Sequence, residues 1–378
     1  MKKKKILLAY ASYGSGHKSA AKYIENYFLN QKNNYEIKIL DISDYNTSFG
    51  KLAESLYSLN FKHNAGYLFT LIYKFFNHKV STLPYKKFTE KLYNQERLQK
   101  AISDFNPDLT ISTHFFVGIL ISKYNKMKII NSKILTVLTD YKSHEIWTRN
   151  FKNEDGLIVG NEIIKNELIE EGLDKNKIYP FGIPLSEKFK SALNKEETYK
   201  RYNLKKDMLT ISFLNGSVGS ANSYDYLKSL LKKRYNVQII MFCGKNETLR
   251  NKCLKLIEEK KYKNIIVLPF TNDVNNLLNI SDLVITKPGG LSTTECLELK
   301  KPMMLIPGNG GPETYNAKFL VLNGFAIKNI NLIKFSRNMK KIIKHPNIIK
   351  NMQNKLNNYE TNTSVIKLYN LSKKLLKK

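Results

Sequence analysis

Cysteine is scarce in this chain of 378 residues, and its few cysteines suggest neither a disulfide framework nor a zinc site. Cys243, Cys253 and Cys296 are odd in number and lack the paired spacing of metal ligands, so we expect reduced thiols in a cytosolic protein. Cys243 and Cys296 fall in apolar strand and helix patterns, where a thiol packs as a small hydrophobic side chain.

Long hydrophobic runs are also missing, which argues against a membrane-spanning helix. Such a helix needs about 20 consecutive apolar residues, and no stretch of the chain reaches that length. The lysines before Ile6–Tyr10 superficially resemble the start of a signal peptide, but the apolar run is too short and Gly14–His17 interrupts it. We therefore expect Ile6–Tyr10 to form a first strand.

Acidic residues are few beside basic ones. The chain has 32 Asp and Glu against 62 Lys and Arg, which gives a formal net charge of +30. A surplus of this size attracts polyanions, either nucleic acids or anionic lipid surfaces. Arginine is scarce beside lysine, and because base-edge readout favours arginine, specific nucleic-acid recognition is the less favoured reading. Heavy use of Lys, Asn, Ile and Tyr also fits an AT-rich coding bias, so part of the charge need carry no function.

The first half of the chain opens as a doubly wound α/β domain would. Lys5–Tyr10 reads as a buried strand, Ala11–Gly16 as a glycine loop, and a helix follows from His17. Glycines in the loop allow close approach of a ligand to the backbone. An imidazole at this position could accept a hydroxyl proton near neutral pH, although His17 could equally cap the helix.

Residues 282–326 are the most informative part of the second half. Leu283–Thr286 reads as a buried strand, which Lys287–Gly290 ends sharply. Ser292, Thr293 and Thr294 occupy expected N-cap positions, and Glu295 would complete a capping box with Ser292. A glycine turn that leads into a helix N-terminus presents unpaired N–H groups and the positive end of the helix dipole, which suits a phosphate.

A second strand–loop–helix unit follows directly. Pro302–Pro307 reads as a strand, a glycine-rich loop comes next, and a helix should begin near Thr314. Parallel strands bring their carboxyl ends to one edge of the sheet, so both loops should meet at the same ligand site. Asn215–Ser220, after the predicted strand Leu209–Leu214, is a further glycine loop of this kind.

Residues 51–91 combine Tyr, Phe and Leu with Lys. This mixture is typical of a helix at a lipid interface, where apolar side chains enter the headgroup boundary and lysines meet phosphate. It also fits an aromatic insertion that packs on its own domain. The pattern alone favours neither reading.

Several segments resemble a known enzyme family, glycosyltransferase family 28. Within it the chain is most similar to the processive diacylglycerol glycosyltransferases and the monogalactosyldiacylglycerol synthases, and more distantly to the enzyme that adds N-acetylglucosamine to lipid I. The loop Ser12–Ile24 resembles the family's N-terminal glycine loop, and Thr139–Trp147 resembles a segment that the lipid I enzyme lacks. In the second half the resemblance rests on Lys287, Gly289, Gly290, Thr293, Glu295, Pro302, Pro307, Glu313, Asn316 and Gly324.

The resemblance implies an α/β fold of two Rossmann-like domains facing a cleft, the glycosyltransferase B architecture. Residues 1–188 would bind the acceptor and the membrane, residues 189–345 would bind the UDP-sugar, and residues 346–378 would form a C-terminal helix that packs back on the first domain.

The resemblance also assigns candidate site residues. His17 would be the catalytic base, with Asp140 as a second base, an orienter of His17 or merely a helix cap. The diphosphate would lie at the N-terminus near Gly290, the ribose at Glu295, and the uracil at Phe270, which could also be a plain strand end. The donor set is Gly16, Gly216, Ser217, Phe270, Gly289, Gly290, Ser292, Thr293, Glu295, Glu313 and Asn316, and the acceptor set is His114, Tyr141, His144 and Trp147.

Two features of these sets leave alternatives open. Trp147, the only tryptophan, could belong to the core rather than contact an acceptor. Pro312 stands where many relatives carry a glutamine that contacts the sugar, so the donor sugar stays undecided between glucose and galactose.

The implied function is an inverting transfer of glucose or galactose from a UDP-sugar to diacylglycerol. The enzyme would be cytoplasmic and bound peripherally to anionic lipids of the inner face of the cell membrane. No cofactor and no obligatory metal are expected, because the sequence has no clustered Asp-x-Asp motif, and no specific nucleic acid is expected as a partner. The alternatives are transfer of N-acetylglucosamine to a polyprenyl-linked peptidoglycan precursor, and a non-catalytic basic protein that binds polyanions.

Overall fold

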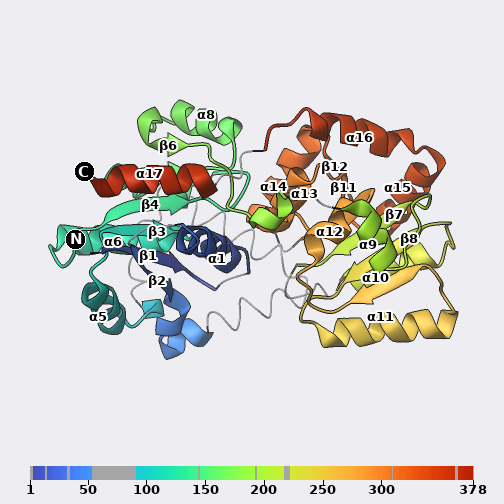
Figure 1. Cartoon of the computed structure of the whole chain (residues 1–378), viewed down its shortest axis with the longest axis horizontal. Coiled ribbons are helices and arrows are strands. Elements are labelled where there is room, and N and C mark those ends of the chain that lie inside the picture. The colour runs from blue at the N-terminus through green and yellow to red at the C-terminus, as the bar shows by residue number, and fades with distance from the viewer. Residues whose placement is uncertain are drawn as a thin grey trace. The chain divides into compact units, whose positions relative to one another are not determined.

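The structure, a computed structural model, describes residues 3–12, 15–31, 35–52, 91–143, 145–191, 194–216, 222–308, 310–361 and 365–377. These residues form two compact units, each an α/β body around a parallel sheet (Figure 1). The first unit takes in the described residues up to Leu185, the short stretch 310–312 and the last helix, and the second takes in those from Ser186 to Gly308 and from Glu313 to Thr361. The first unit's main segment ends at Leu185. The sequence had placed this boundary at residue 188.

The first unit has a six-stranded sheet with the order β2-β1-β3-β4-β5-β6, in which all neighbours are parallel. The inner strands β1, β3, β4 and β5 are mostly buried, because helices cover both faces of a parallel sheet, whereas the edge strand β2 alternates polar and apolar residues. The strands are β1 (Lys4–Tyr10), β2 (Tyr35–Asp41), β3 (Leu109–Ser112), β4 (Lys133–Val137), β5 (Gly156–Ile158) and β6 (Ile178–Tyr179). The helices are α1 (Ser15–Leu29), α5 (Gln95–Phe105), α6 (Phe115–Lys126), α7 (Glu145–Thr148), α8 (Glu162–Glu170) and α17 (Val365–Lys377), with short 3₁₀ turns at Ile42–Tyr45, Phe151–Asn153 and Lys175–Lys177.

The second unit has its own six-stranded sheet, with the order β12-β11-β10-β7-β8-β9 and again only parallel neighbours. Its strands are β7 (Thr210–Leu214), β8 (Gln238–Phe242), β9 (Ile265–Leu268), β10 (Leu283–Thr286), β11 (Met303–Leu305) and β12 (Ala326–Lys328). Its helices are α9 (Lys195–Arg201), α10 (Ser223–Leu231), α11 (Glu247–Lys260), α12 (Val274–Asn279), α13 (Gly290–Glu298), α14 (Pro312–Leu322), α15 (Leu332–Lys344) and α16 (Asn347–Asn357), with a 3₁₀ turn at Glu187–Phe189.

Side-chain caps fix where several helices begin. The Asn94 side chain accepts a hydrogen bond from the Arg97 N–H at 3.0 Å at the start of α5, and Asn161 does the same for Ile164 at 2.9 Å at the start of α8. Each cap satisfies one of the N–H groups that a helix N-terminus leaves unpaired. Helix α5 ends at Phe105, and its C-cap Asn106 adopts the left-handed conformation (φ 48°) that asparagine tolerates better than most residues.

The expected C-terminal helix, residues 346–378, is divided between the two units. Helix α17 lies in the same unit as β1, and its Tyr369 ring meets Phe28 of α1 edge-on, with ring centroids 5.0 Å apart. Leu368 and Tyr369 are buried in one hydrophobic cluster with Ile6, Leu8 and Ile24. Helix α16 instead belongs to the second unit, where Met352 is buried against the β7–β8 core.

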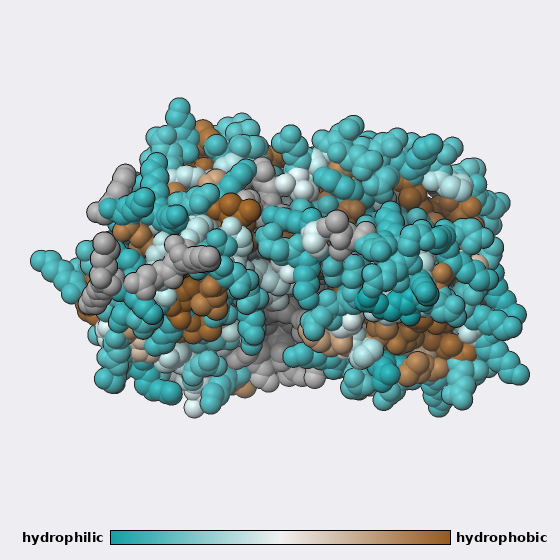
Figure 2. Space-filling view, in the orientation of Figure 1, coloured by the Kyte–Doolittle hydropathy of each residue, from teal (hydrophilic) through white to brown (hydrophobic). Residues whose placement is uncertain are grey.

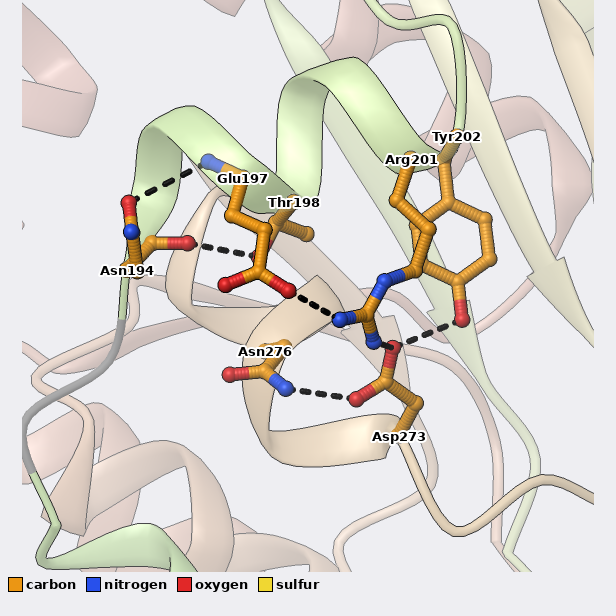
Figure 3. A network of polar contacts seen from close by, with 7 residues as sticks. All are labelled: Asn194, Glu197, Thr198, Arg201, Tyr202, Asp273 and Asn276. Atoms are coloured by element: carbon orange, nitrogen blue, oxygen red, sulfur yellow. Dashed lines mark hydrogen bonds and ion pairs between the residues drawn. The ribbon is translucent and has the colours of Figure 1, made fainter.

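A polar network joins the first and fourth helices of the second unit, α9 and α12 (Figure 3). The Asp273 carboxylate accepts hydrogen bonds from the Tyr202 hydroxyl at 2.7 Å and the Asn276 amide at 2.5 Å, and it pairs with Arg201 at 3.2 Å. Arg201 also pairs with Glu197 on α9. Partial burial acts to raise the pKa of Asp273, but these donors and the Arg201 charge outweigh it and lower the pKa. The network fixes the end of the loop that joins β9 to α12.

The structure corrects the predicted helix starts near the glycine turn. Strand β10 spans Leu283–Thr286 as predicted, but α13 begins at Gly290, and Gly289 is its N-cap without a side-chain hydrogen bond. The capping box of Ser292 with Glu295 is therefore wrong. Thr294 donates to the Gly290 carbonyl at 2.8 Å, one turn back inside the helix. Helix α14 starts at Pro312 instead of Thr314, because the fixed φ of proline suits the first position of a helix.

Among the described residues, no helix is both long enough and apolar enough to cross a membrane. Figure 2 shows a face that is mostly hydrophilic, with hydrophobic residues gathered in a few separate patches. The interfacial helix or insertion expected from residues 51–91 falls on residues 53–90, which lie outside the described part of the chain.

The packing of α17 yields a stability prediction. Leu368, which is 1% exposed, lies in the cluster around β1, whereas Ile366 on the same helix is 45% exposed. We expect Leu368→Ala to lower the free energy of unfolding by about 2–5 kcal/mol, and Ile366→Ala to change it by about 0.5 kcal/mol or less. Urea unfolding of the full chain measures both, and equal losses would contradict the assignment of α17 to this core.

Candidate active site

In the first unit the ends of three neighbouring strands converge on His17. Strand β1 lies between β2 and β3, so the chain leaves it in one direction for β2 and reaches β3 on the other side. Ligand sites of open α/β sheets form at such a switch point, beyond the carboxyl ends of the strands. The register pairs Ala9 with Ser112 and Ser112 with Thr136, so the segments that follow β1, β3 and β4 begin side by side.

His17 is held by the segments after β3 and β4. Its Nδ1 lies 2.6 Å from the carbonyl oxygen of Thr113 and 3.2 Å from the hydroxyl of Thr139. The Thr113 hydroxyl in turn donates to the His17 carbonyl at 3.0 Å. A carbonyl oxygen can only accept, so Nδ1 carries the hydrogen and Nε2 has the lone pair. Nε2 makes no hydrogen bond to any residue that the structure describes.

Burial keeps this imidazole neutral. Desolvation lowers the pKa of His17 to about 4, and the hydrogen bond to the Thr113 carbonyl opposes this only in part. The His114 ring stands edge-on to that of His17 with centroids 5.1 Å apart, and desolvation, with a smaller contribution from the repulsion that two charged imidazoles would feel, lowers the pKa of His114 well below its usual value. His17 is therefore an uncharged hydrogen-bond acceptor at neutral pH.

Asp140 does not orient His17 as the sequence suggested. The Nδ1 position that an orienting carboxylate would occupy is taken by Thr113 and Thr139. Neither threonine was predicted as a site residue. Each stands just beyond a strand end, Thr113 after β3 and Thr139 before Asp140, and that position was the available signal.

The candidate acceptor residues lie beneath His17 rather than on the surface. His114 is 7% exposed, and its ring caps α6 by accepting from the Phe116 N–H at 3.4 Å. Trp147 is 5% exposed, packs edge-on against Phe115 and has its ring 6.3 Å from that of His17. Tyr141 is buried as well. The structure thus has Trp147 in the core, the alternative reading of its sequence, and His144 lies outside the described residues.

The glycine loop after β1 leaves room beside His17. The Ser12 N–H donates to Asp41 at 3.2 Å and to the Ser43 hydroxyl at 3.0 Å, so the loop starts from a fixed point at the ends of β1 and β2. Helix α1 begins at Ser15, which places Gly16 in its first turn. A Cβ at Gly16 would meet no described atom within 4 Å. A side chain at this position would therefore not be blocked by the described part of the chain.

The second unit repeats the arrangement at the switch point between β7 and β10. Thr286 pairs with Leu214 on one side and with Leu305 on the other, and its hydroxyl donates to the Leu214 carbonyl at 2.8 Å. The loops after β7, β10 and β11 therefore start next to one another, as the sequence predicted. Gly216 adopts a positive φ of 67°, which favours glycine there, while Ser217 lies outside the described residues.

The N-terminus of α13 is fixed from behind. Asn316, fully buried on α14, donates to the Pro288 carbonyl at 3.0 Å and so holds the turn that precedes Gly289. Thr293 is also fully buried, and its hydroxyl has no hydrogen-bond partner among the described residues. The structure thus places both side chains below the surface, and the first N–H groups of α13, together with the partly exposed Ser292, are what a phosphate could reach.

Glu313 reaches over two glycines of these loops. A Cβ at Gly308 would lie 2.1 Å from Glu313 Oε2, and one at Gly289 would lie 3.8 Å from Oε1, so the carboxylate occupies space that a side chain at 308 would fill. Burial lowers the pKa of Lys287, and the charge of Glu313 acts in the opposite direction. Lys287 was part of the family resemblance but was not predicted as a site residue, and its place at the end of β10 was the signal.

Glu295 has a strongly perturbed carboxyl group. Desolvation alone raises its pKa to about 8. Its carboxyl group makes no hydrogen bond or ion pair with the described residues. Once ionised, the carboxylate accepts hydrogen bonds only, so it suits a ligand that offers hydroxyl donors, such as a sugar ring with adjacent hydroxyls.

Phe270, two residues after β9, is 50% exposed and has the Lys245 ammonium 5.7 Å from its ring centre. An exposed ring beside a cation can receive a planar ligand group. Lys245 follows β8, and the Asn215 amide ties the end of β7 to the Phe242 carbonyl of that strand at 2.8 Å. Within the described residues no three His, Cys, Asp or Glu side chains cluster as metal ligands would.

Comparison with known families gives matches in both halves of the chain. Residues 17–185 match the model of the monogalactosyldiacylglycerol (MGDG) synthase family, and residues 210–369 match that of the glycosyltransferase family 28 C-terminal domain. The chain is 28% identical over 331 residues to a processive diacylglycerol beta-glucosyltransferase of Staphylococcus epidermidis, covering 85% of this chain and 80% of that protein. A protein of the same name from Bacillus pumilus is 28% identical over 337 residues, covering 86% and 82%.

Solved structures of similar fold cover the whole chain. MurG from Acinetobacter baumannii has a TM-score of 0.60 at 15% identity and covers 98% of this chain and 99% of its own. UDP-GlcNAc 2-epimerase from Neisseria meningitidis, bound to UDP-GlcNAc, has a TM-score of 0.61 at 15% identity, covering 99% and 100%. At such identities the likeness shows the fold, and it confirms the predicted α/β class of two Rossmann-like domains with glycosyltransferase B architecture.

The raised pKa of Glu295 yields a prediction for stability against pH. The folded pKa of about 8 lies above the ordinary value of 4.5, so the folded state keeps its proton longer than the unfolded state. The contribution of protonated Glu295 to the free energy of unfolding is therefore fully present below the ordinary pKa of 4.5, and it is lost as pH rises through the folded pKa. We expect Glu295→Gln to unfold at a progressively higher temperature than the wild type between about pH 5 and pH 9.

Thermal unfolding across that range measures the effect. Glu258→Gln, an equal loss of charge on the exposed side of α11, is the control and should shift the melting temperature by the same small amount at every pH. A pH-independent difference between Glu295→Gln and wild type would contradict the assignment.

Proposed function

We propose that this chain, which belongs to the monogalactosyldiacylglycerol synthase and processive diacylglycerol glycosyltransferase family within glycosyltransferase family 28, transfers a hexose from a UDP-sugar to diacylglycerol. Membership of the family makes it a glycosyltransferase of glycolipid synthesis. The named relatives support diacylglycerol as the acceptor and glucose as the hexose.

One observation in the structure carries the donor half of this proposal. Within the region that matches the family 28 C-terminal domain, a helix N-terminus without a side-chain cap at Gly289 is followed on the same helix by Glu295, whose carboxyl has no partner among the described residues. The N–H groups near Gly290 suit the diphosphate, and Glu295 suits the two ribose hydroxyls. Phe270 with Lys245 suits the uracil, and Glu313 suits the hydroxyls of the hexose.

The reaction that we propose is a direct displacement with inversion. The primary hydroxyl oxygen of diacylglycerol attacks the anomeric carbon, the bond to the UDP oxygen breaks, and the hydroxyl proton passes to Nε2 of His17. Nδ1, bonded to the Thr113 carbonyl and the Thr139 hydroxyl, keeps Nε2 as the acceptor nitrogen. The negative charge that develops on UDP would be stabilised by the fixed N–H dipoles of the α13 N-terminus.

The pKa of ligand-free His17 fits a base that becomes charged only during the reaction. A neutral His17 accepts a hydroxyl hydrogen bond without the desolvation cost of an imidazolium, and an anionic group of a bound ligand would stabilise the imidazolium that forms. We further propose that the enzyme needs no metal or other cofactor and acts in the cytoplasm at the inner face of the cell membrane.

The decisive experiment is product analysis. The full chain is incubated with diacylglycerol vesicles and either UDP-glucose or UDP-galactose, and the lipids are identified by mass spectrometry and NMR. We expect β-glucosyldiacylglycerol from UDP-glucose. Transfer of N-acetylglucosamine to a polyprenyl-linked muropeptide, offered in parallel, or no transfer to any acceptor would overturn the proposal.

His17→Ala should lower turnover by about 10²–10⁴-fold, the usual contribution of a positioned general base. Binding of UDP, measured by calorimetry, should stay within about twofold of wild type, because His17 belongs to the acceptor half of the mechanism. Near-normal turnover of the variant would remove His17 from the mechanism.

The pH profile separates a catalytic from a structural role. Because ligand-free His17 is neutral above a pKa of about 4, kcat/KM for the UDP-sugar, which reports the enzyme before the donor binds, should not fall with an ordinary histidine pKa between about pH 7.5 and pH 5.5. A decline with a midpoint near 6.5 would contradict the pKa assigned to the buried ring.

Thr139→Val, which removes one Nδ1 contact, should lower turnover less than His17→Ala and leave UDP affinity unchanged.

A further inference from the structure

An open groove of about 860 Å³ runs along the helical layer of the second unit, between α10 and α15. It is lined by the end of α10, by Tyr235 just before β8, and by the length of α15. It therefore lies on the outer side of the helices and not in the loops that follow β7 and β10. The proposed donor site does not account for it.

Helix α15 has two opposite sides. Phe335, Met339 and Ile342 are buried, and Phe335 meets Tyr226 of α10 edge-on with ring centroids 5.0 Å apart. Ile333, Arg337, Lys340 and Lys344 follow the spacing i, i+4, i+7, i+11, which places them in one stripe on the exposed side. The buried stripe holds the helix in place, so the exposed stripe is not needed for its packing.

The charges along the groove are all of one sign. Lys233, in the turn after α10, lines it together with Arg337, Lys340 and Lys344 of α15, and no acidic residue does. None of these four basic side chains forms an ion pair with a described residue. The sequence has no Asp or Glu between Glu313 and Glu360, so the whole of α15 and α16 is free of compensating charge.

Apolar side chains stand exposed at one end of the same stripe. Ile333 is 71% exposed and Leu332 is 40% exposed, and both line the groove. Exposed aliphatic residues beside unpaired lysines are what a surface needs to meet phosphate groups and the edge of the acyl region together. A nucleic-acid surface would use the lysines but would gain nothing from bare aliphatic side chains.

We propose that the α10–α15 groove, with its stripe Ile333–Lys344, docks the second unit on a bilayer that contains anionic phospholipid. Its four basic groups meet the lipid phosphates, and Leu332 and Ile333 enter the headgroup region. This membrane contact rests on the proposed function, because an enzyme that glycosylates a lipid must reach its acceptor at a membrane. It lies on the donor-binding unit, separate from the aromatic segment at residues 51–91.

The test is vesicle sedimentation of the full chain without any sugar donor. The vesicles contain phosphatidylcholine either alone or in equal parts with phosphatidylglycerol. Arg337→Glu/Lys340→Glu should weaken binding to the anionic vesicles at least tenfold, because each basic residue near an anionic surface adds to binding. Lys252→Glu/Lys255→Glu on α11 changes the net charge equally at exposed positions outside the groove and is the matched control. It should bind within about threefold of wild type.

Ile333→Asn tests the apolar part without a change of charge. We expect weaker binding to anionic vesicles, about threefold or more, and an unchanged melting temperature because the side chain is exposed. If Arg337→Glu/Lys340→Glu bound anionic vesicles like wild type, the proposal would be overturned. Unchanged vesicle binding with lost affinity for a random-sequence DNA duplex would replace the bilayer by nucleic acid as the occupant.

Activity assays keep this proposal separate from the proposed function. With diacylglycerol in neutral detergent micelles the double variant should transfer sugar as well as wild type, whereas on anionic vesicles it should lose transfer in proportion to binding. Groove-dependent vesicle binding by a chain that transfers no sugar would overturn the function and support the groove. If the chain transferred sugar but its vesicle binding did not depend on the groove residues, the proposed function would be supported and the groove proposal overturned.

Discussion

Parallel pairing at two switch points is the constraint on which the candidate sites depend. In the first unit β1 pairs with β2 and β3, and in the second β10 pairs with β7 and β11. Because the backbone hydrogen bonds fix the register, the loops that leave these strands start at the same level and their residues meet. His17 reaches Thr113 across 96 positions of sequence for this reason alone. The turn at Gly289 reaches Glu313 in the same way.

Burial sets the electrostatic state of both candidate sites in the absence of a ligand. Desolvation lowers the pKa of His17 and raises that of Glu295, so the base is uncharged and the carboxyl retains its proton at neutral pH. A bound ligand can favour the charged form of each group: an anion would favour the imidazolium of His17, and hydroxyl donors would favour the carboxylate of Glu295. The basic groove of α15 is the opposite case, since its charges stay in solvent and act on a surface outside the molecule.

Much of the fold and part of the site could be predicted from local patterns. Apolar runs such as Leu283–Thr286 mark buried parallel strands, and glycine turns after them mark ligand loops, because both signals are contained in a few consecutive residues. Helix starts were harder. Ser292 and Glu295 had the spacing of a capping box, but the extended backbone of Gly289 lets the helix begin earlier, and Thr294 bonds back into the helix instead.

Short motifs were enough to identify the family, the α/β class and His17, Gly290 and Glu295 as candidate site residues, because each motif lies within a few consecutive residues. The contacts of those groups could be read only from the folded chain. It placed Thr113 and Thr139 rather than Asp140 on His17, buried Trp147, His114 and Asn316, and left Arg337 and Lys340 together in solvent beside α10. The physical reason is that hydrogen-bond partners and desolvation arise from strand register and helix packing, which join residues far apart in the chain.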